Sequence, residues 1–283
     1  MDRDKSKFLA HLKKFGTTLT EYVSTNGGEW SIKGFIDVDK NIHTISSDTK
    51  IISKILEIQL FPKFLEFAEN IGYELVPAKH QNWYPDMSFV GKTDSSVKFA
   101  VDIKTTYRLP DRVDFCNGFT LGSHGAYFRD RTSTKNIQFP YGDYKAHICL
   151  GILYTRAPAG DAGKTGIRGI NELTAITSVI RDLLFFAEEK WKIASDRSGS
   201  GNTSNIGSIN YIPDILSGNG TFAGLGETVF DQYWMNQGVL QVPDPGKPNE
   251  FKKLTRVTEF LRFRGMDPSR INRPEPRRKA GQS

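Results

Sequence analysis

The amino-acid sequence predicts an α/β fold, because helical and strand-like segments alternate along the chain. An amphipathic pattern over residues 1–24 predicts a helix, since Phe8, Leu12 and Leu19 fall on one side of it. The run ICLGILY at 148–154 is apolar throughout, as is typical of a strand buried inside a sheet. This run is also too short to cross a bilayer, so it does not predict a membrane protein.

Other local signals predict the remaining elements. The turn-prone DVDKN at 37–41 predicts a hairpin within 30–45, and Asp48 is a candidate N-cap for a helix that Pro62 should kink or end. A helical pattern resumes after Pro62. Strands are expected at 84–91 and 96–105, a long helix at 172–192 and a last helix near 252–265, whereas residues 107–135 are expected to be irregular.

Composition favours one ordered globular domain. The chain has 283 residues, of which 12% are aromatic, and it shows no internal repeat and no clear linker. The first residues, MDRDKSKFLAHLKKFG, lack the apolar core of a signal peptide, so we expect a soluble cytoplasmic protein. Cys116 and Cys149 are too few for a disulfide scaffold or a zinc site by themselves.

The positive charge is concentrated at the C-terminal end. Residues 250–283 contain ten Lys and Arg but four Asp and Glu, which accounts for the whole net charge of +6. Residues 1–249 are therefore neutral, and an acidic partner would have to be met there by local patches. The Pro- and Arg-rich segment 266–283 is expected to be a basic, disordered tail.

A possible phosphate-binding loop can be set aside. GDAGKTG at 160–166 resembles such a loop, but the motif needs a first glycine at the position of Pro158. The sequence therefore does not predict a nucleotide triphosphatase.

The segment 84–106 contains two aspartates and a lysine whose spacing suits the binding of a metal ion and a phosphate. Along KFAVDIKT, strand alternation places Ala100, Asp102 and Lys104 on one face. Asp86 begins the preceding strand and can join them if the two strands pair. Two carboxylates can bind a hard cation with a substrate phosphate, and a lysine can act beside the attacking water.

This is the P-D…(D/E)-x-K pattern of Mg²⁺-dependent nucleases, but short motifs are weak signals. The chain has four Pro-Asp pairs and five (D/E)-x-K triplets, and only Asp86 with Asp102 and Lys104 combines a strand-like setting with a plausible spacing. A cross-strand charge pair on a solvated sheet face is an equally good interpretation of these residues alone. Glu57 shares a polar helix face with Lys54, which favours an exposed salt bridge.

Six motifs occur together and in a fixed order: HQNWYPD (80–86), VDIKTTY (101–107), TKNI (134–137), YTR (154–156), SGSGNTSNIGSI (198–209) and FDQYW (230–234). The sequence SDTK at 47–50, with Glu57, extends the set. This set resembles the EcoRV family of type II restriction endonucleases, within the PD-(D/E)xK nuclease superfamily, from about residue 30 to 265. The glycine-rich motif, which composition alone would assign to a flexible linker, is its most distinctive part.

The resemblance implies a restriction-endonuclease-like core with a central mixed β-sheet flanked by helices. It implies a single domain over 1–265, in which about 1–46 and part of 150–170 form a small dimerisation region of hairpin and helix. It also implies a homodimer that binds double-stranded DNA in a cleft.

Site residues follow from the same resemblance. Asp86 and Asp102 resemble the Mg²⁺ ligands, Lys104 resembles the catalytic lysine, and Glu57 matches an accessory acidic residue that also serves the metal. The expected DNA contacts are Gly199, Gly201, Asn202 and Thr203 in the major groove, Gln81 and Asn82 in the minor groove, and, more weakly, Thr105, Thr106 and Lys135 at phosphates.

The family further implies cleavage of GATATC to blunt ends and a partner methyltransferase that protects host DNA. His80, Trp83 and the stretch 107–133 depart from the family pattern, and the tail after Gly265 has no counterpart in it. Two alternatives are a catalytically idle DNA-binding protein and a structure-directed repair or junction nuclease. Clustered carboxylates argue against the first, and a Gly-Asn-Thr reading loop argues against the second.

Overall fold

The computed structural model describes residues 2–158, 166–199, 201, 204–244, 246–247 and 249–274. Residue contacts group these into two compact units. Unit 1 comprises 1–75, 103–117 and 150–187, and unit 2 comprises 76–102, 118–149 and 188–283. The chain crosses from one unit to the other within β3 (Tyr73–Pro77), β5 (Lys98–Leu109), β8 (Tyr144–Arg156) and β10 (Ile180–Glu189). The expectation of one domain over 1–265 stays a prediction.

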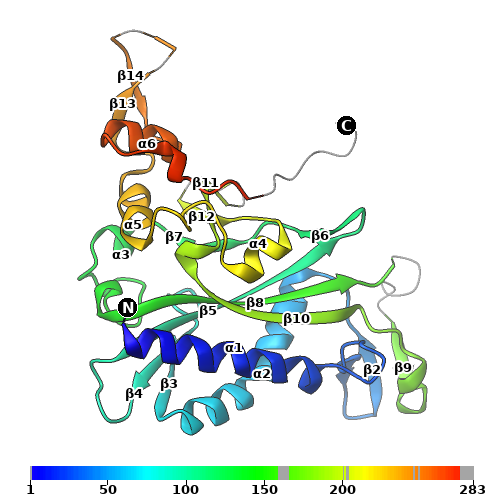
Figure 1. Ribbon diagram of the computed structural model, residues 1–283. Helices are drawn as coiled ribbons and strands as arrows, with labels where there is room; N and C mark the ends of the chain where they lie inside the picture. The colour runs from blue at the N-terminus through cyan, green and yellow to red at the C-terminus, as the bar shows by residue number, and fades with distance from the viewer. Residues whose placement is uncertain are drawn as a thin grey trace. The chain divides into compact units, whose positions relative to one another are not determined.

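The central sheet has six strands in the order β10-β8-β5-β4-β3, with β6 paired to β5 (Figure 1). The other strands are β4 (Met87–Gly91) and β6 (Arg112–Cys116). Every residue of β8 from Ala146 to Tyr154 is buried, as the apolar run predicted. The predicted α/β class, with a central mixed sheet flanked by helices, is therefore confirmed.

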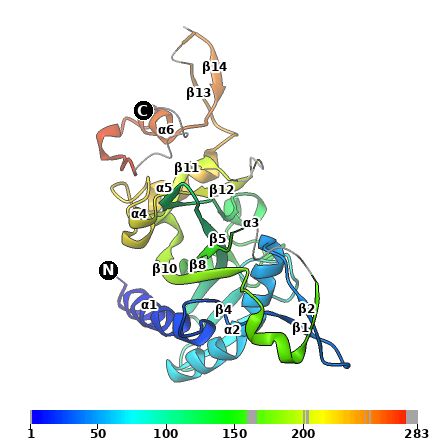
Figure 2. The ribbon, with the colours of Figure 1, turned by 90° about the vertical axis from the view of Figure 1, so that its right-hand side faces the viewer.

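Two long helices of unit 1 begin where the sequence predicted. Asp2 caps α1 (Arg3–Val23) by accepting hydrogen bonds from the amides of Asp4 and Lys5. Asp48 caps α2 (Thr49–Asn70) in the same way. The two helices lie side by side (Figures 1 and 2), and the rings of Phe15 and Phe67 stack between them at 4.4 Å.

Of the two expectations for Pro62, a kink or an end of the helix, the end is wrong. The helix continues through this proline, although a proline inside a helix removes one hydrogen bond. Leu60 and Phe64 on either side are buried, and the ring of Phe64 packs edge-on against Phe15 of α1 at 5.7 Å. Packing against α1 thus outweighs the local cost of the proline.

The predicted hairpin is present in unit 1. β1 (Gly34–Ile36) pairs antiparallel with β2 (Asn41–Thr44), and β9 (Ile167–Gly169) adds a third strand on β2. Hydrogen bonds from the ring of His43 and from Asn41 lower the pKa of Asp37 to about 2. This carboxylate closes the turn of the hairpin.

Two expectations about later segments are wrong. Residues 172–192 do not form a long helix but contain η2 (Ile170–Ala175), β10 and η3 (Lys190–Lys192). The run LLFFAEE is almost continuously buried, and an apolar run of this kind suits a buried strand as well as a helix. Residues 107–135 are not irregular, because they contain β6, β7 (Thr120–Ser123) and α3 (Ala126–Arg129).

Unit 2 also contains a three-stranded sheet of order β11-β12-β7, in which β11 spans Ala194–Ser198 and β12 spans Asn205–Ser208. The C-terminal part of the unit contains the hairpin of β13 (Gln241–Pro243) and β14 (Phe251–Lys253), which lies beside helix α6 (Val257–Phe263) (Figure 2). Besides α3, α6 and η3, the helices and turns described in this unit are η1 (Tyr141–Asp143), α4 (Ile212–Ser217), α5 (Glu227–Asn236) and η4 (Pro268–Arg270).

The first part of the expected tail is structured. The main-chain amide of Asn272 donates to the carbonyl of Thr221, and the guanidinium of Arg270 donates to the carbonyl of Gly224 at 3.1 Å. The expectation of disorder is therefore wrong for 266–274, while 275–283 lie outside the described residues. Within the described part of the chain, no helix has both the length and the apolar character needed to span a bilayer.

We predict that Gly151→Ala lowers the free energy of unfolding by about 1–3 kcal/mol, because it overpacks the contact between β8 and β10. A Cβ at this position would lie 2.0 Å from the ring of Phe186. The matched control is Gly16→Ala in α1, where the new Cβ would meet Phe185 at an ordinary 3.6 Å. Denaturant unfolding should show a gain of about 0.5–1 kcal/mol for the control. Equal effects of the two substitutions would contradict this packing.

Candidate functional site

The pairing of β4 with β5 sets the positions of the two predicted aspartates. Met87 pairs with Val101 and Ser88 with Ala100 in an antiparallel register. Asp86 immediately precedes β4, and Asp102 follows Val101 on β5, so both residues adjoin the last pair of this register. Residues opposite each other on neighbouring strands lie about 4.5–5.5 Å apart at Cβ. Both carboxylates belong to unit 2, and their joint role as metal ligands stays a prediction.

Burial separates the two interpretations of this charge pattern. Asp102 is 6% exposed, and residues 99–103 of β5 are all buried. The pair is therefore not part of a solvated sheet face. Lys104 follows two residues later on the same strand and is half-buried. Because side chains alternate along a strand, Lys104 lies on the same face of β5 as Asp102.

Tyr84 holds the chain immediately before Asp86. Its main-chain amide donates to the carbonyl of Asn136, and its own carbonyl accepts from the amide of Gln138 at 2.8 Å. Its buried hydroxyl lies 2.9 Å from Nδ1 of His147, and its ring stacks on that of Tyr127. The main chain leading to Asp86 is thus fixed from several directions.

The hydrogen bond between Tyr84 and His147 joins two neutral groups. Burial raises the pKa of Tyr84 well above its usual value. Burial, and then the positive charge of Lys190, lower the pKa of His147 far below its usual value. Nε2 of His147 faces the carbonyl of Tyr141 at 3.2 Å, so that nitrogen carries the proton and Nδ1 accepts from Tyr84.

Glu57 lies on α2 of unit 1, where it forms an ion pair with Lys54 one turn away. This contact agrees with the salt bridge expected from the residues alone. Among the residues that the structure describes, no three His, Cys, Asp or Glu side chains form a group suited to a metal ion. The accessory role of Glu57 therefore stays a prediction.

The predicted minor-groove residues lie on a turn in unit 2. Gln81 and Asn82 are exposed, and the turn is closed by a hydrogen bond from the amide of Trp83 to the carbonyl of His80. The rings of His80 and Trp83 make an edge contact at 4.6 Å. The two residues that depart from the family pattern thus pack on each other, and Gln81 and Asn82 point their polar groups to solvent.

The glycine-rich motif joins β11 to β12 and is not a linker between domains. The amide of Gly199 donates to the carbonyl of Asn205 at 2.8 Å, which closes the loop. A Cβ on Gly199 would meet Thr120 at 3.0 Å, and Gly201 has a positive φ of 68°. Both glycines therefore have structural reasons to be glycine. Asn202 and Thr203 lie outside the described residues.

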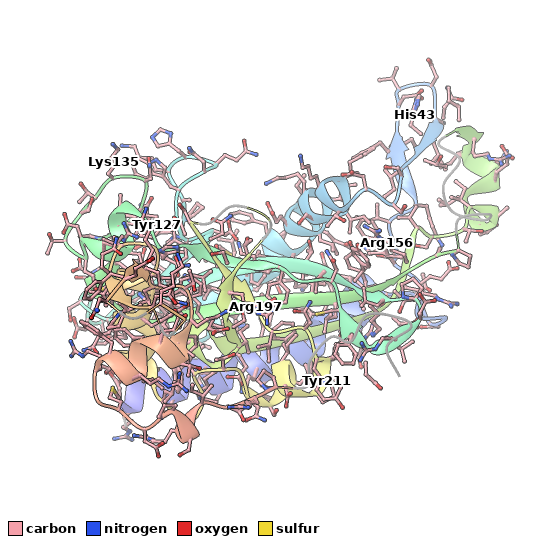
Figure 3. All side chains as sticks on the ribbon, turned by 90° about the horizontal axis from the view of Figure 1, so that it is seen from above. His43, Tyr127, Lys135, Arg156, Arg197 and Tyr211 are labelled. Carbon is pink, nitrogen blue, oxygen red and sulfur yellow. The ribbon has the colours of Figure 1, made fainter. Side chains whose placement is uncertain are left out.

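The predicted phosphate contacts differ in their surroundings. The hydroxyl of Thr106 is buried and donates to the carbonyl of Asn117, so it is engaged inside unit 1. Thr105 shares a hydrogen bond of 2.8 Å with Ser53 of α2. Lys135 is exposed on the loop after α3 (Figure 3), where its charge is accessible. Of the three, Lys135 has the setting that a phosphate contact requires.

Residues from three of the sequence motifs meet in unit 1. The guanidinium of Arg156 lies 3.6 Å from the centre of the Tyr107 ring and donates to the hydroxyl of Thr49 at 2.8 Å (Figure 3). The start of α2 is in this way tied to the ends of β5 and β8. The three residues belong to motifs identified in the sequence. Their contact could not be predicted, because the residues are far apart along the chain.

The donor set on β4 and β5 fits a hard divalent cation. Asp86, immediately before β4, and the buried Asp102 on β5 would offer the carboxylate oxygens that a hard divalent cation prefers. Burying a carboxylate is costly unless a partner compensates its charge. A cation held by Asp86 and Asp102 would be one further partner of this kind.

Comparison with known proteins identifies the family of this chain. The family model of restriction endonuclease EcoRV matches residues 26–265. The type II restriction enzyme EcoRV of Escherichia coli is 37% identical over 209 residues, which cover 74% of this chain and 82% of that enzyme. The chain therefore belongs to the EcoRV family of type II restriction endonucleases, a family of deoxyribonucleases.

Proposed function

We propose that this enzyme is a Mg²⁺-dependent endonuclease that cuts double-stranded DNA within the palindrome GATATC and leaves blunt ends. The observation that supports the catalytic part is the antiparallel register of β4 and β5, whose last pair, Met87 with Val101, adjoins Asp86 and the buried Asp102. Family membership supports the choice of DNA as the substrate.

Asp86 and Asp102 are the proposed metal ligands, and Glu57 is proposed as an accessory acidic residue. When bound, a divalent cation polarises the scissile phosphate and favours the hydroxide form of a bound water. The carboxylates hold the site in place, because their strands are fixed by the sheet and by the contacts of Tyr84.

Hydrolysis breaks the bond between phosphorus and the 3′ oxygen, and the attacking water adds its oxygen to phosphorus. Lys104, on the same side of β5 as Asp102, can stabilise the negative charge that develops on the phosphate or orient that water. A strand-borne lysine suits this role because the strand restricts its position.

Base reading is assigned to the loop between β11 and β12, with Gly199, Gly201, Asn202 and Thr203 in the major groove. Glycines let the main chain approach base edges, Asn can bond to adenine N6 and N7, and Thr can contact the thymine methyl. Gln81 and Asn82 are proposed to follow the minor groove, and Thr105, Thr106 and Lys135 to contact phosphates. The exposure of Gln81, Asn82 and Lys135 supports their proposed contacts with DNA.

A homodimer is the proposed assembly, since a palindrome read by two equal subunits presents each with one half-site. The sheet of β1, β2 and β9 supports this, because it exposes Phe35, Ile36, Val38 and Ile167, with Val38 97% exposed. Exposed apolar groups of this kind often mark a protein interface. A methyltransferase with the same recognition sequence is proposed as the partner that protects host DNA.

We predict that Asp86→Ala abolishes cleavage of plasmid DNA in Mg²⁺ because one of two metal ligands is lost. Gel analysis of the products, with end mapping for the wild type, checks this result. EDTA should abolish wild-type cleavage in the same assay. The matched control is Asp94→Ala on the exposed turn between the same two strands, which should cut at the wild-type rate. A cleaving Asp86→Ala variant would refute the assignment, and cleavage in EDTA would refute the metal requirement.

We predict that Asn202→Ala reduces discrimination between GATATC and singly substituted sites by about 1–3 kcal/mol, which is the value of one bidentate base contact. Competition cleavage of duplexes that differ at one base pair measures this quantity. Asn219→Ala, in unit 2 but outside the loop, serves as the control. If Asn202→Ala weakened binding to all duplexes equally, Asn202 would position DNA rather than read it.

A further inference from the structure

The first strand of the reading loop contains an irregularity that bears on sequence selection. Ala194 of β11 pairs with Ser208 of β12, and Ser198 pairs with Ile206. Between these pairs β11 advances four residues while β12 advances two. The segment Ser195–Arg197 therefore bulges out of the ladder, and a bulge redirects the side chains that it carries.

Short-range bonds stabilise this bulge. The hydroxyl of Ser195 accepts from the amide of Arg197 at 3.1 Å and lies 3.2 Å from the carbonyl of Gly207 on β12. A Cβ at Gly207 would come within 2.6 Å of the carbonyl oxygen of Arg197. The absence of a side chain at Gly207 is thus required for the bulge, which is a specific local conformation and not a frayed strand end.

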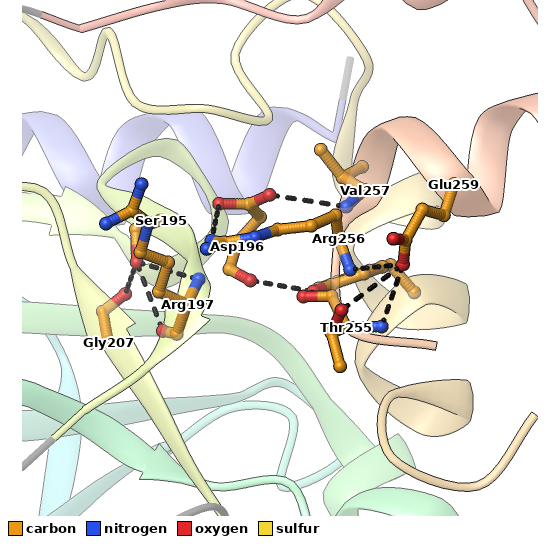
Figure 4. A network of polar contacts seen from close by, with 9 residues as sticks. Ser195, Asp196, Arg197, Gly207, Thr255, Arg256, Val257 and Glu259 are labelled. Carbon is orange, nitrogen blue, oxygen red and sulfur yellow. Dashed lines mark hydrogen bonds and ion pairs between the residues drawn. The ribbon is translucent and has the colours of Figure 1, made fainter. Parts of the chain in front are cut away.

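Asp196 projects from the bulge to the C-terminal helix of unit 2 (Figure 4). Its carboxylate accepts a hydrogen bond from the amide of Val257, the first residue of α6, at 3.3 Å. The guanidinium of Arg256 lies 3.6 Å from the same carboxylate. The amide of Val257 is one of those that a helix start leaves without a partner inside the helix.

Tyr233 of α5 links the same two segments from the other side. Its hydroxyl lies 2.7 Å from the carbonyl of Asp196 and 2.9 Å from the carbonyl of Thr255. Burial, and then the negative charge of Asp196, raise the pKa of Tyr233 well above its usual value, so the hydroxyl keeps its proton and can donate. Its ring is fully buried and packs against Phe260 of α6.

The segment that receives Asp196 is itself rigid. Glu259 accepts hydrogen bonds from the amides of Thr255 and Arg256, both at 3.1 Å, and forms an ion pair of 2.7 Å with Lys252 of β14. Partial burial opposes ionisation of Glu259, but the bond from Lys252 and these main-chain bonds outweigh it and lower its pKa. Asp196 is therefore attached to a fixed support.

We propose that Asp196 is a positioning residue for sequence selection, which acts by fixing the first strand of the reading loop to α6 through Val257, Arg256 and Tyr233. Gly199, where the loop begins, is three residues further along the chain. The ladder between β11 and β12 is irregular, so the contacts of Asp196 limit the angle at which the loop leaves the sheet. This inference rests on the proposed base-reading role of that loop.

The test combines two measurements on the full-length protein. Hydrogen exchange without DNA reports the protection of the amide of Gly199, which bonds to the carbonyl of Asn205. Competition cleavage reports selectivity for the mapped site over singly substituted duplexes. The variants are Asp196→Ala, Asp196→Asn and Tyr233→Phe, with Glu250→Ala as the control because Glu250 forms an exposed ion pair with Lys247 in the same unit.

We expect Asp196→Ala to speed exchange at Gly199 and to lower selectivity, each by about tenfold, the effect of losing one or two hydrogen bonds. Asp196→Asn keeps an acceptor for Val257 and should recover part of both losses, and the control should match the wild type. Tyr233→Phe removes one hydroxyl from a buried ring. If Asp196→Ala does not fold, hydrogen exchange at Gly199 and competition cleavage can be measured on Tyr233→Phe instead.

The outcomes separate this inference from the proposed function. Unchanged exchange at Gly199 in Asp196→Ala and Tyr233→Phe would overturn the positioning role. Faster exchange with unchanged selectivity would overturn it as well, provided that Asn202→Ala loses selectivity. If Asn202→Ala and Asp196→Ala both kept full selectivity, the base-reading role of the loop would itself be refuted.

Discussion

The register between β4 and β5 is the constraint on which the catalytic site depends. Side chains of a strand alternate between faces, so a slip of one residue would carry Asp102 to the opposite face from Asp86. Phe89 and Phe99 pair directly and are both fully buried, which makes such a slip costly. The contacts of Tyr84 add a second restraint just before Asp86. The position of two carboxylates is thus set by apolar packing and by a neutral hydrogen bond.

The neutrality of that support matters for the chemistry. Tyr84 and His147 both keep their uncharged forms, because burial raises the pKa of one and lowers the pKa of the other. The contacts beside Asp86 therefore do not change charge around neutral pH. In the proposed site, the ligands for a cation would come from Asp86 and Asp102 rather than from this support.

Local signals predicted much of the fold, and non-local contacts account for the failures. Asp48 and the DVDKN turn act within a few residues, so the start of α2 and the hairpin could be predicted. The run around Phe185 and Phe186 is apolar at consecutive positions, and only its pairing in the sheet makes it a strand. Asp86, Asp102 and Lys104 are candidates because of a motif, whereas the contacts of Asp196 with α6 join residues about sixty positions apart and leave no local pattern.

The same compact unit contains the two proposed metal ligands and both strands of the reading loop. A short path connects them. Lys190 lies 4.4 Å from the centre of the Tyr84 ring, which anchors the chain before Asp86, and four residues later β11 begins at Ala194. Misplacing reacting groups by about 1 Å can cost a hundredfold in rate. Placing the proposed metal ligands and the strands of the proposed reading loop in one packed unit would fix the distance between them. Correct binding of the bases by the loop would then determine the position of the phosphate relative to the carboxylates.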